Sequence, residues 1–160
     1  MKPTSFVLNV DSDGLVSASE FSTLLPLRGI YVISHEKQII RVGESSSGMS
    51  RLKKGFRDPL RHTRRGKDRK NYIAYSWRAN YLGKPVQVDY FELKDLAFEG
   101  NAFRRSLEAE LTFQFRVATK SWPIEMSEIH FLERFRKERL IIETTTAILR
   151  HYGIDYDATI

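Results

Sequence analysis

Residues 51–70 hold the densest charge in the sequence, with ten Lys and Arg but only two Asp. This segment has a net charge of +8, whereas the whole chain of 160 residues has +6, so the remaining residues sum to −2. Lysines and arginines gathered in this way neutralise phosphates and release the counterions condensed on nucleic acid. A solvated basic surface without a partner is the competing interpretation. The residues expected to contact nucleic acid are Lys53, Lys54, Arg57, Arg61, His62, Arg64, Arg65 and Lys67.

A second set of residues is defined by its spacing. The tripeptide Gly29-Ile30-Tyr31 is followed, ten residues after its tyrosine, by Arg41-Val42-Gly43. Arg51 comes eight residues after Gly43, and Leu107-Glu108-Ala109-Glu110-Leu111 lies later in the chain. In this order the set resembles the GIY-YIG nuclease family, with Arg41-Val42-Gly43 in the place of the family's Tyr-Ile-Gly. The resemblance covers roughly residues 27–125.

The resemblance implies a metal-dependent endonuclease that hydrolyses phosphodiester bonds of DNA. In such an enzyme Tyr31 is the general base or positions the attacking water, Arg51 clamps the phosphate, and Glu108 binds Mg²⁺ or Mn²⁺. This chemistry needs a base, cationic groups that contact the phosphate oxygens, and a Lewis acid that stabilises the leaving oxygen. Arginine suits the second task because its fork donates two hydrogen bonds and stays charged. One glutamate suits the third because Mg²⁺ often binds through one or two carboxylates and keeps several waters.

The sequence departs from the family pattern at three places. Arg41 stands where the family has a tyrosine, and its cation would lower the pKa of Tyr31 or grip the phosphate. Gly55 stands where the family often has a histidine or tyrosine, for which His62 or Tyr72 are the candidates. No asparagine follows the glutamate helix, and the candidates for its structural role are Glu125, Ser127 and His130.

Each candidate residue also has an ordinary structural interpretation. Tyr31 can be a packed strand aromatic, Arg41 an edge-strand arginine in solvent, and Arg51 one more basic residue on a solvated helix. Glu108 and Glu110 lie at opposite edges of one helical stripe, so spacing alone does not choose between them. The family pattern favours Glu108. The apolar stripe itself consists of Phe103, Leu107, Leu111 and Phe115.

Hydrophobic patterns predict the elements that must position these residues. Residues 29–43 read as a β-hairpin, 49–56 as a short helix, and 72–77 and 86–91 as two strands that pair with each other. A long helix begins near residue 101, and residues 129–152 are mostly helical up to a stop at Gly153. The segment through residue 14 is expected to be irregular or weakly extended. The fold class is therefore α/β of the α+β type, a small mixed or antiparallel sheet flanked by helices.

The expected organisation is one nuclease-like domain over residues 1–160. Its β-β-α-β-α core spans about 27–125, and residues 126–160 form a C-terminal helical extension. The apolar face of the C-terminal helix either closes the core of its own domain or forms a homodimer. That face consists of Phe135, Leu140, Ile141, Thr144, Ala147, Ile148 and Tyr152.

Composition narrows the class of protein. The chain has no cysteine, which excludes disulfides and thiolate metal sites. It has no apolar run of membrane-spanning length and no signal-peptide pattern, so we expect a cytoplasmic protein whose partner is DNA. The alternative function is a non-catalytic nucleic-acid-binding module on the same scaffold, which would not need Tyr31, Arg51 and Glu108. A weaker alternative is a basic regulatory protein that binds a partner through its C-terminal helix.

Overall fold

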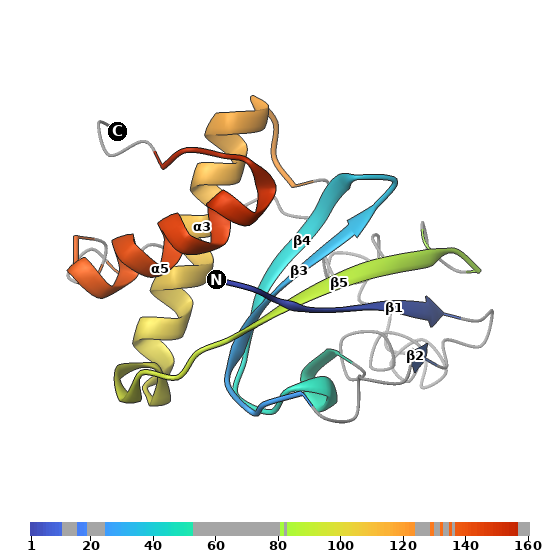
Figure 1. The fold of residues 1–160 in the computed structure, drawn as a ribbon, viewed down its shortest axis with the longest axis horizontal. Helices are drawn as coiled ribbons and strands as arrows, with labels where there is room; N and C mark the ends of the chain where they lie inside the picture. The colour runs from blue at the N-terminus through green and yellow to red at the C-terminus, as the bar shows by residue number, and fades with distance from the viewer. Residues whose placement is uncertain are drawn as a thin grey trace, which may run out of the picture.

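A five-stranded antiparallel sheet forms the centre of the fold, in the strand order β2-β1-β5-β3-β4 (Figure 1). The computed structural model describes residues 1–10, 16–18, 25–52, 81, 83–123, 129, 132, 135 and 137–156. The predicted α+β class, a small antiparallel sheet with helices, is confirmed. The strands are β1 (Thr4–Val10), β2 (Val16–Ala18), β3 (Gly29–His35), β4 (Gln38–Ser45) and β5 (Pro85–Glu92).

Both faces of the sheet are apolar. One face carries a core cluster that includes Phe6, Ile33, Val88 and Tyr90. The other face is covered by helices α3 (Asn101–Thr119) and α5 (Arg139–Leu149), together with the short 3₁₀ helices η2 (Leu96–Glu99) and η3 (Arg150–Tyr152) (Figure 1). No helix in the described part of the chain is long and apolar enough to cross a membrane.

The predicted hairpin is present as β3 and β4, and it contains a bulge that the sequence did not indicate. Ser34 lies opposite Ile39, whereas Ile33 lies opposite Arg41, so Ile40 has no partner in β3. Directly opposed residues of antiparallel strands point to the same face. Because of the extra residue, Arg41 shares the face of Ile33 and Tyr31; without it, Arg41 would point to the helix-covered face. The turn itself uses Glu36 and Lys37, both with positive φ.

The apolar stripe predicted for the long helix is also confirmed. Leu107, Leu111 and Phe115 are buried in the core between α3 and the sheet, and Phe103 packs against that core. The predicted helical stop is found at Gly153, whose φ of 69° places it in the left-handed region. Glycine adopts this conformation at little cost, which is why it ends helices so often.

Two expectations need correction or fall outside the structure. The segment through residue 14, expected to be irregular or weakly extended, is extended in residues 4–10, which form the regular strand β1 with Phe6 and Leu8 buried on one face and β5 as its neighbour. The strand predicted at 86–91 is β5, but it pairs with β1 and β3. Its expected partner at 72–77 lies outside the described residues, as does the predicted short helix beyond residue 52.

The C-terminal helix buries its apolar face inside the same chain. Ile141 and Ile148 belong to the core shared with α3 and the sheet, and Thr144 is buried beside them. The apolar face of α5 was expected either to close the core of its own domain or to form a homodimer. In the described residues it closes the core of its own domain. A homodimer through this helix stays a prediction.

Replacing Ile141 by alanine should lower the free energy of unfolding by about 2–5 kcal/mol, because it leaves a cavity in the core. Ile142→Ala is the matched control, since Ile142 is half-buried on the next position of the same helix. Denaturant unfolding of both variants measures the difference. Equal losses for Ile141→Ala and Ile142→Ala would contradict the packing of α5 described here.

Candidate active site

The Tyr31 side chain lies across the edge strand β4. A Cβ atom built on Gly43 would overlap the end of the Tyr31 ring, including its hydroxyl. Gly43 is the β4 residue directly opposite Tyr31, and β4 is the outermost strand of the sheet. The missing side chain at position 43 therefore lets the phenol reach the edge of the sheet, although Tyr31 remains 6 % exposed.

A second tyrosine repeats this arrangement one strand further in. A Cβ atom on Gly29 would overlap the ring and hydroxyl of Tyr90. The Tyr90 hydroxyl donates a hydrogen bond of 3.1 Å to the carbonyl oxygen of Pro26. Burial raises the pKa of Tyr90 to about 12, so it stays protonated at neutral pH. Both motif glycines thus have a packing role, which is to make room for a tyrosine of the neighbouring strand.

A tight loop after β4 positions Arg51. The buried Ser45 accepts a hydrogen bond of 3.1 Å from the Ser47 amide and donates one of 3.1 Å to the Gly48 carbonyl. Gly48 has a φ of +52°, and a Cβ there would lie 2.9 Å from the Pro26 carbonyl oxygen. Only glycine meets both demands without strain. Residues 49–52 are helical, with Arg51 exposed.

Glu108 lies half-buried on α3 within electrostatic reach of the other three candidates. Burial raises the pKa of Glu108 to about 7; Arg41, Arg51 and Arg105 oppose this shift, while Glu44 adds to it. The four residues that the sequence singled out for catalysis come from β3, β4, the turn after β4, and α3. We call this group the edge site: Tyr31, Arg41, Arg51 and Glu108.

The pKa of Tyr31 is raised, which differs from what the sequence suggested. Its largest cause is burial, and the negative charge of Glu108 acts in the same direction. Arg41 lowers the pKa by its charge and by a hydrogen bond to the phenol, and Arg51 lowers it too. The expected effect of Arg41 is therefore present, but burial outweighs it. The hydroxyl is protonated at neutral pH in the absence of further positive charge.

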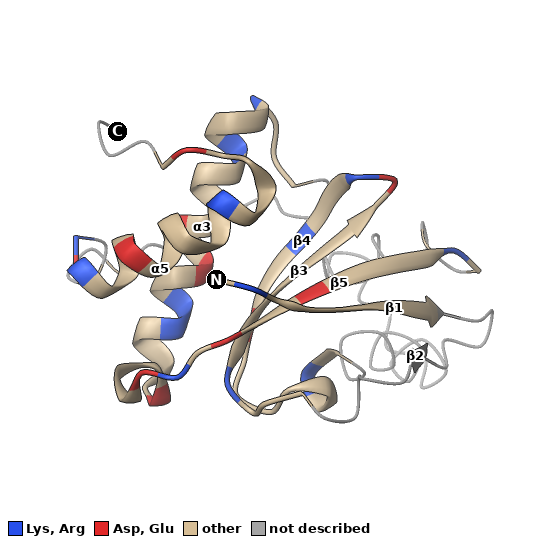
Figure 2. Cartoon of the chain, in the orientation of Figure 1, with Lys and Arg blue, Asp and Glu red and all other residues tan. Residues whose placement is uncertain are grey.

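A buried ion pair that the sequence analysis missed joins β4 to α3. Arg104 Nε donates to Glu44 Oε2 at 2.7 Å, and Arg104 also donates to the carbonyl oxygens of Phe98 and Glu99 at 2.6 and 2.7 Å. Glu108 follows Arg104 by one helical turn, so this pair fixes the part of α3 that carries it. The two residues are 60 positions apart in the sequence, so no local pattern indicated the pair. Figure 2 shows a basic residue in the middle of β4 and both signs of charge along α3.

Glu110, the alternative ligand, is engaged elsewhere. It is buried, and its Oε1 accepts hydrogen bonds from Gln114 Nε2 at 3.0 Å and from the Tyr156 hydroxyl at 3.1 Å. Neither of these partners belongs to the edge site. Sequence spacing alone did not choose between Glu108 and Glu110 as the metal ligand. Their different surroundings in the structure favour Glu108.

The donor set of the edge site suits a hard cation that keeps its waters. Among the described residues there is no group of three or more His, Asp or Glu side chains placed to hold a metal. Glu108 offers one carboxylate, while Glu44 is held by Arg104. Mg²⁺ and Mn²⁺ accept such a site, whereas a zinc site with three or four protein ligands does not fit it.

Several predicted residues cannot be placed, because they lie outside the described part of the chain. The candidates for the family's missing histidine or tyrosine, His62 and Tyr72, are among them. So are the candidates for its asparagine, and the whole predicted nucleic-acid contact set: Glu125, Ser127, His130, Lys53, Lys54, Arg57, Arg61, Arg64, Arg65 and Lys67.

Comparison with known proteins gives one similar structure. No family model and no curated protein sequence matches this chain. Among solved structures, the restriction endonuclease HPY188I in complex with product DNA is similar with a TM-score of 0.44 and 14% sequence identity. The likeness covers 77% of this chain and 78% of that chain. A likeness of this degree says nothing about the chemistry of the edge site.

Gly43→Ala should lower the free energy of unfolding by about 1–3 kcal/mol, because the added methyl group displaces the Tyr31 ring. The same change made in a Tyr31→Leu background should cost far less, since leucine lacks the overlapping end of the ring. Denaturant unfolding of the four proteins of this double-mutant cycle gives the coupling. A cost of Gly43→Ala that is independent of residue 31 would contradict the contact.

Proposed function

We propose that this chain is a metal-dependent endonuclease of the GIY-YIG type that hydrolyses phosphodiester bonds of DNA. The observation that carries the proposal is the edge site: a phenol, two guanidinium groups and a carboxylate act on one another's charge beside β4, the end strand of the sheet that the described residues form. The roles of these residues, the metal and the substrate are parts of the proposal. So is the treatment of residues 1–160 as one nuclease domain.

In this proposal the two arginines hold the substrate. Arg41 and Arg51 donate hydrogen bonds to the non-bridging oxygens of the scissile phosphate and oppose the charge that develops there. Both already lower the pKa of Glu108 and of Tyr31, so both lie close to the reacting groups. Their permanent charge makes this contribution independent of pH.

Tyr31 orients the attacking water. Because its hydroxyl is protonated in the free protein, its oxygen first accepts a hydrogen bond from the water. Added positive charge would lower the pKa of Tyr31, and only after the phenol has lost its own proton to solvent could the phenolate take a proton from the water. Glu108 would hold the divalent ion, which supplies the Lewis acidity for the leaving 3′ oxygen.

Glu108 also makes the proposed activity dependent on pH. With a pKa of about 7, its carboxyl is partly protonated at neutral pH in the metal-free protein. A cation binds the ionised form, so metal affinity should rise as the pH increases through 7. Cleavage should therefore need less metal at pH 8 than at pH 6.

A non-catalytic nucleic-acid-binding module is the second candidate. The observation in its favour is the raised pKa of Tyr31, which by itself makes the phenol a poor base. The two functions differ in whether the protein cuts DNA.

Homodimerisation through the C-terminal helix is a further proposal; it would use the solvent-facing side of α5, because Ile141 and Ile148 are buried within the chain.

Incubation of plasmid DNA with the protein and Mg²⁺ tests the proposed activity. Wild-type protein should cut, chelation of the metal should stop the reaction, and Glu108→Gln should reduce the rate by about 10²-fold or more. Glu110→Gln is the matched control on the same helix and should cut like wild type if it folds. Full activity of Glu108→Gln together with an inactive, folded Glu110→Gln would show that the ligand is wrongly chosen. Absence of cleavage by wild type would leave the binding module as the better account.

The basic run should supply affinity for DNA rather than chemistry. Neutralising Arg64, Arg65 and Lys67 should reduce the salt dependence of binding by up to about one slope unit for each lost phosphate contact. Binding is measured in the Glu108→Gln background, so that cleavage does not interfere. Neutralising Lys2, Lys94 and Lys137, three exposed lysines elsewhere, is the control. An unchanged slope for the first variant would mean that the run is only a solvated surface.

A further inference from the structure

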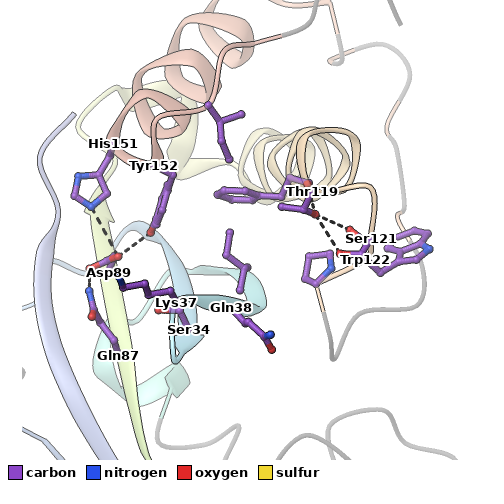
Figure 3. A pocket seen from close by; sticks show the side chains of 14 residues that line it. Ser34, Lys37, Gln38, Gln87, Asp89, Thr119, Ser121, Trp122, His151 and Tyr152 are labelled. Atoms are coloured by element: carbon purple, nitrogen blue, oxygen red, sulfur yellow. Dashed lines mark hydrogen bonds and ion pairs between the residues drawn. The ribbon is translucent and has the colours of Figure 1, made fainter.

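A pocket of about 750 Å³ lies on the helix-covered side of the sheet, beside the β3–β4 turn (Figure 3). Its walls come from the sheet, the C-terminal end of α3 and η3. Ile39, Phe115 and Tyr152 give it apolar and aromatic surface, while Asp89 and Gln38 give it polar groups. This combination and this volume are typical of pockets that bind small organic ligands.

Asp89 places a buried negative charge on the wall of the pocket. It is 2 % exposed. Its Oδ1 accepts hydrogen bonds from Ser5 at 2.6 Å and from Gln87 at 3.1 Å, and its Oδ2 accepts one from Tyr152 at 2.9 Å. All three donors are neutral.

The one potential cation beside Asp89 among the described residues is His151, with Nε2 3.8 Å from Oδ2, and it is charged only when protonated. The described residues give Asp89 no lysine or arginine within ion-pair distance, although Lys37 also lines the pocket. Buried carboxylates are usually compensated by a cation or by a full set of N–H donors. Within the described part of the chain Asp89 Oδ2 accepts one hydrogen bond, from Tyr152, so a ligand that brings an N–H donor to this oxygen would be favoured.

Amide and aromatic side chains complete the pocket. Gln38 is exposed, and its side-chain amide makes no hydrogen bond within the described part of the chain. The Trp122 ring also lines the pocket, and the Arg116 guanidinium is stacked on it, 4.2 Å from the ring centroid. Glutamine amides and aspartate carboxylates pair with the edges of bases, aspartate in particular with the amino group of cytosine. Aromatic rings stack on their faces.

The pocket and the edge site are bounded by the same two elements. Along β4, Ile39 in the pocket is two residues from Arg41, a separation of about 7 Å. Along α3, Phe115 in the pocket is seven residues from Glu108, about 10 Å. The pocket therefore shares β4 and α3 with the edge site but lies on the helix-covered face of the sheet, opposite the face of Tyr31 and Arg41.

We propose that this pocket binds a nucleobase that carries an exocyclic amino group. The amino group donates to Asp89 Oδ2, the Gln38 amide pairs with the adjoining atoms of the base edge, and Lys37 neutralises the attached phosphate. A free mononucleotide and an unstacked base of bound DNA present the same chemistry. The DNA source rests on the proposed nuclease function, whereas the free nucleotide does not.

Cytidine and uridine monophosphate form a matched pair of probes, because they differ in an amino group against a carbonyl oxygen at one ring position. Titration of ¹⁵N-labelled, metal-free protein followed by NMR should show cytidine monophosphate shifting the side-chain signals of Gln38 and Trp122. Uridine monophosphate should bind about tenfold more weakly, the discrimination expected of one good base-edge contact. Equal affinity for the two nucleotides, or shifts away from the pocket, would overturn the proposal.

Two variants connect the binding to the pocket. Asp89→Asn should abolish the preference for the cytosine nucleotide, because Asp89 receives the amino group. Gln38→Met should weaken the binding of both nucleotides, because its amide pairs with the adjoining base edge. Asn9→Leu removes an exposed amide from β1 outside the pocket and should change nothing. Because Asp89 is buried and its substitution can unfold the protein, Gln38→Met at an exposed position carries the test alone if needed. A folded Gln38→Met that binds cytidine monophosphate as tightly as the wild type overturns the proposal.

An oligonucleotide arm distinguishes the two sources of the base. In the Glu108→Gln background, a cytosine-containing strand should bind more tightly than its uracil-substituted copy, and Gln38→Met should weaken the binding of the cytosine strand. Discrimination with the oligonucleotide identifies nucleic acid as the source, and discrimination confined to the mononucleotides identifies a free nucleotide. Lack of discrimination in both arms contradicts the pocket assignment. A wild type that fails to cleave DNA leaves the mononucleotide comparison unaffected, so the two proposals fail separately.

Discussion

The Tyr31 ring lies across β4 because Gly43 offers no side chain to stop it. This contact determines where the Tyr31 hydroxyl lies, and the other three residues of the edge site lie around that hydroxyl. The bulge at Ile40 rotates Arg41 onto the face of Tyr31, and the Gly48 turn directs the chain to Arg51. The opposite side is set by the Glu44–Arg104 pair, which holds α3 against β4. A larger residue at position 43 would move the phenol and leave these groups without their common neighbour.

Burial and charge oppose each other in this site. Burial raises the pKa of both Tyr31 and Glu108, while the arginines lower both. The result is a phenol that keeps its proton and a carboxyl that titrates near neutrality. Two permanent cations then face a neutral phenol and a carboxyl that is partly protonated at neutral pH, which leaves the site with an excess of positive charge. Such a site suits the binding of a phosphate, and ionisation of Glu108 supplies the negative charge that a divalent cation beside the phosphate would need.

Local patterns in the sequence predicted those elements whose core contacts are regular. The β-branched and aromatic runs within residues 29–43 predicted the β3–β4 hairpin. The apolar residues that recur every four positions from Phe103 to Phe115 predicted the buried face of α3. The N-terminal strand was missed because only Phe6 and Leu8 alternate in it, and its stability comes from pairing with β5. The bulge at Ile40 depends on the register between two strands, which no single strand encodes.

The spacing that resembles the GIY-YIG family predicted which residues form the edge site. It did not predict their pKa values or their hydrogen-bond partners. Spacing could not separate Glu108 from Glu110, because that difference arises from where Gln114 and Tyr156 place their hydrogen bonds. The Glu44–Arg104 pair joins residues 60 positions apart, so it leaves no local signal. Likewise, the Asp89 pocket is assembled from residues of several elements, so no local pattern predicted it.

The pKa of the Glu108 carboxyl, measured by NMR titration of the metal-free protein, tests most directly whether these four groups share one site. The account predicts a value of about 7, raised above the ordinary 4.5 by burial. It further predicts that Arg41→Met raises this pKa, because a nearby cation is lost, whereas Lys94→Met leaves it unchanged. A Glu108 that titrates near 4.5 and does not respond to Arg41→Met would contradict the edge site.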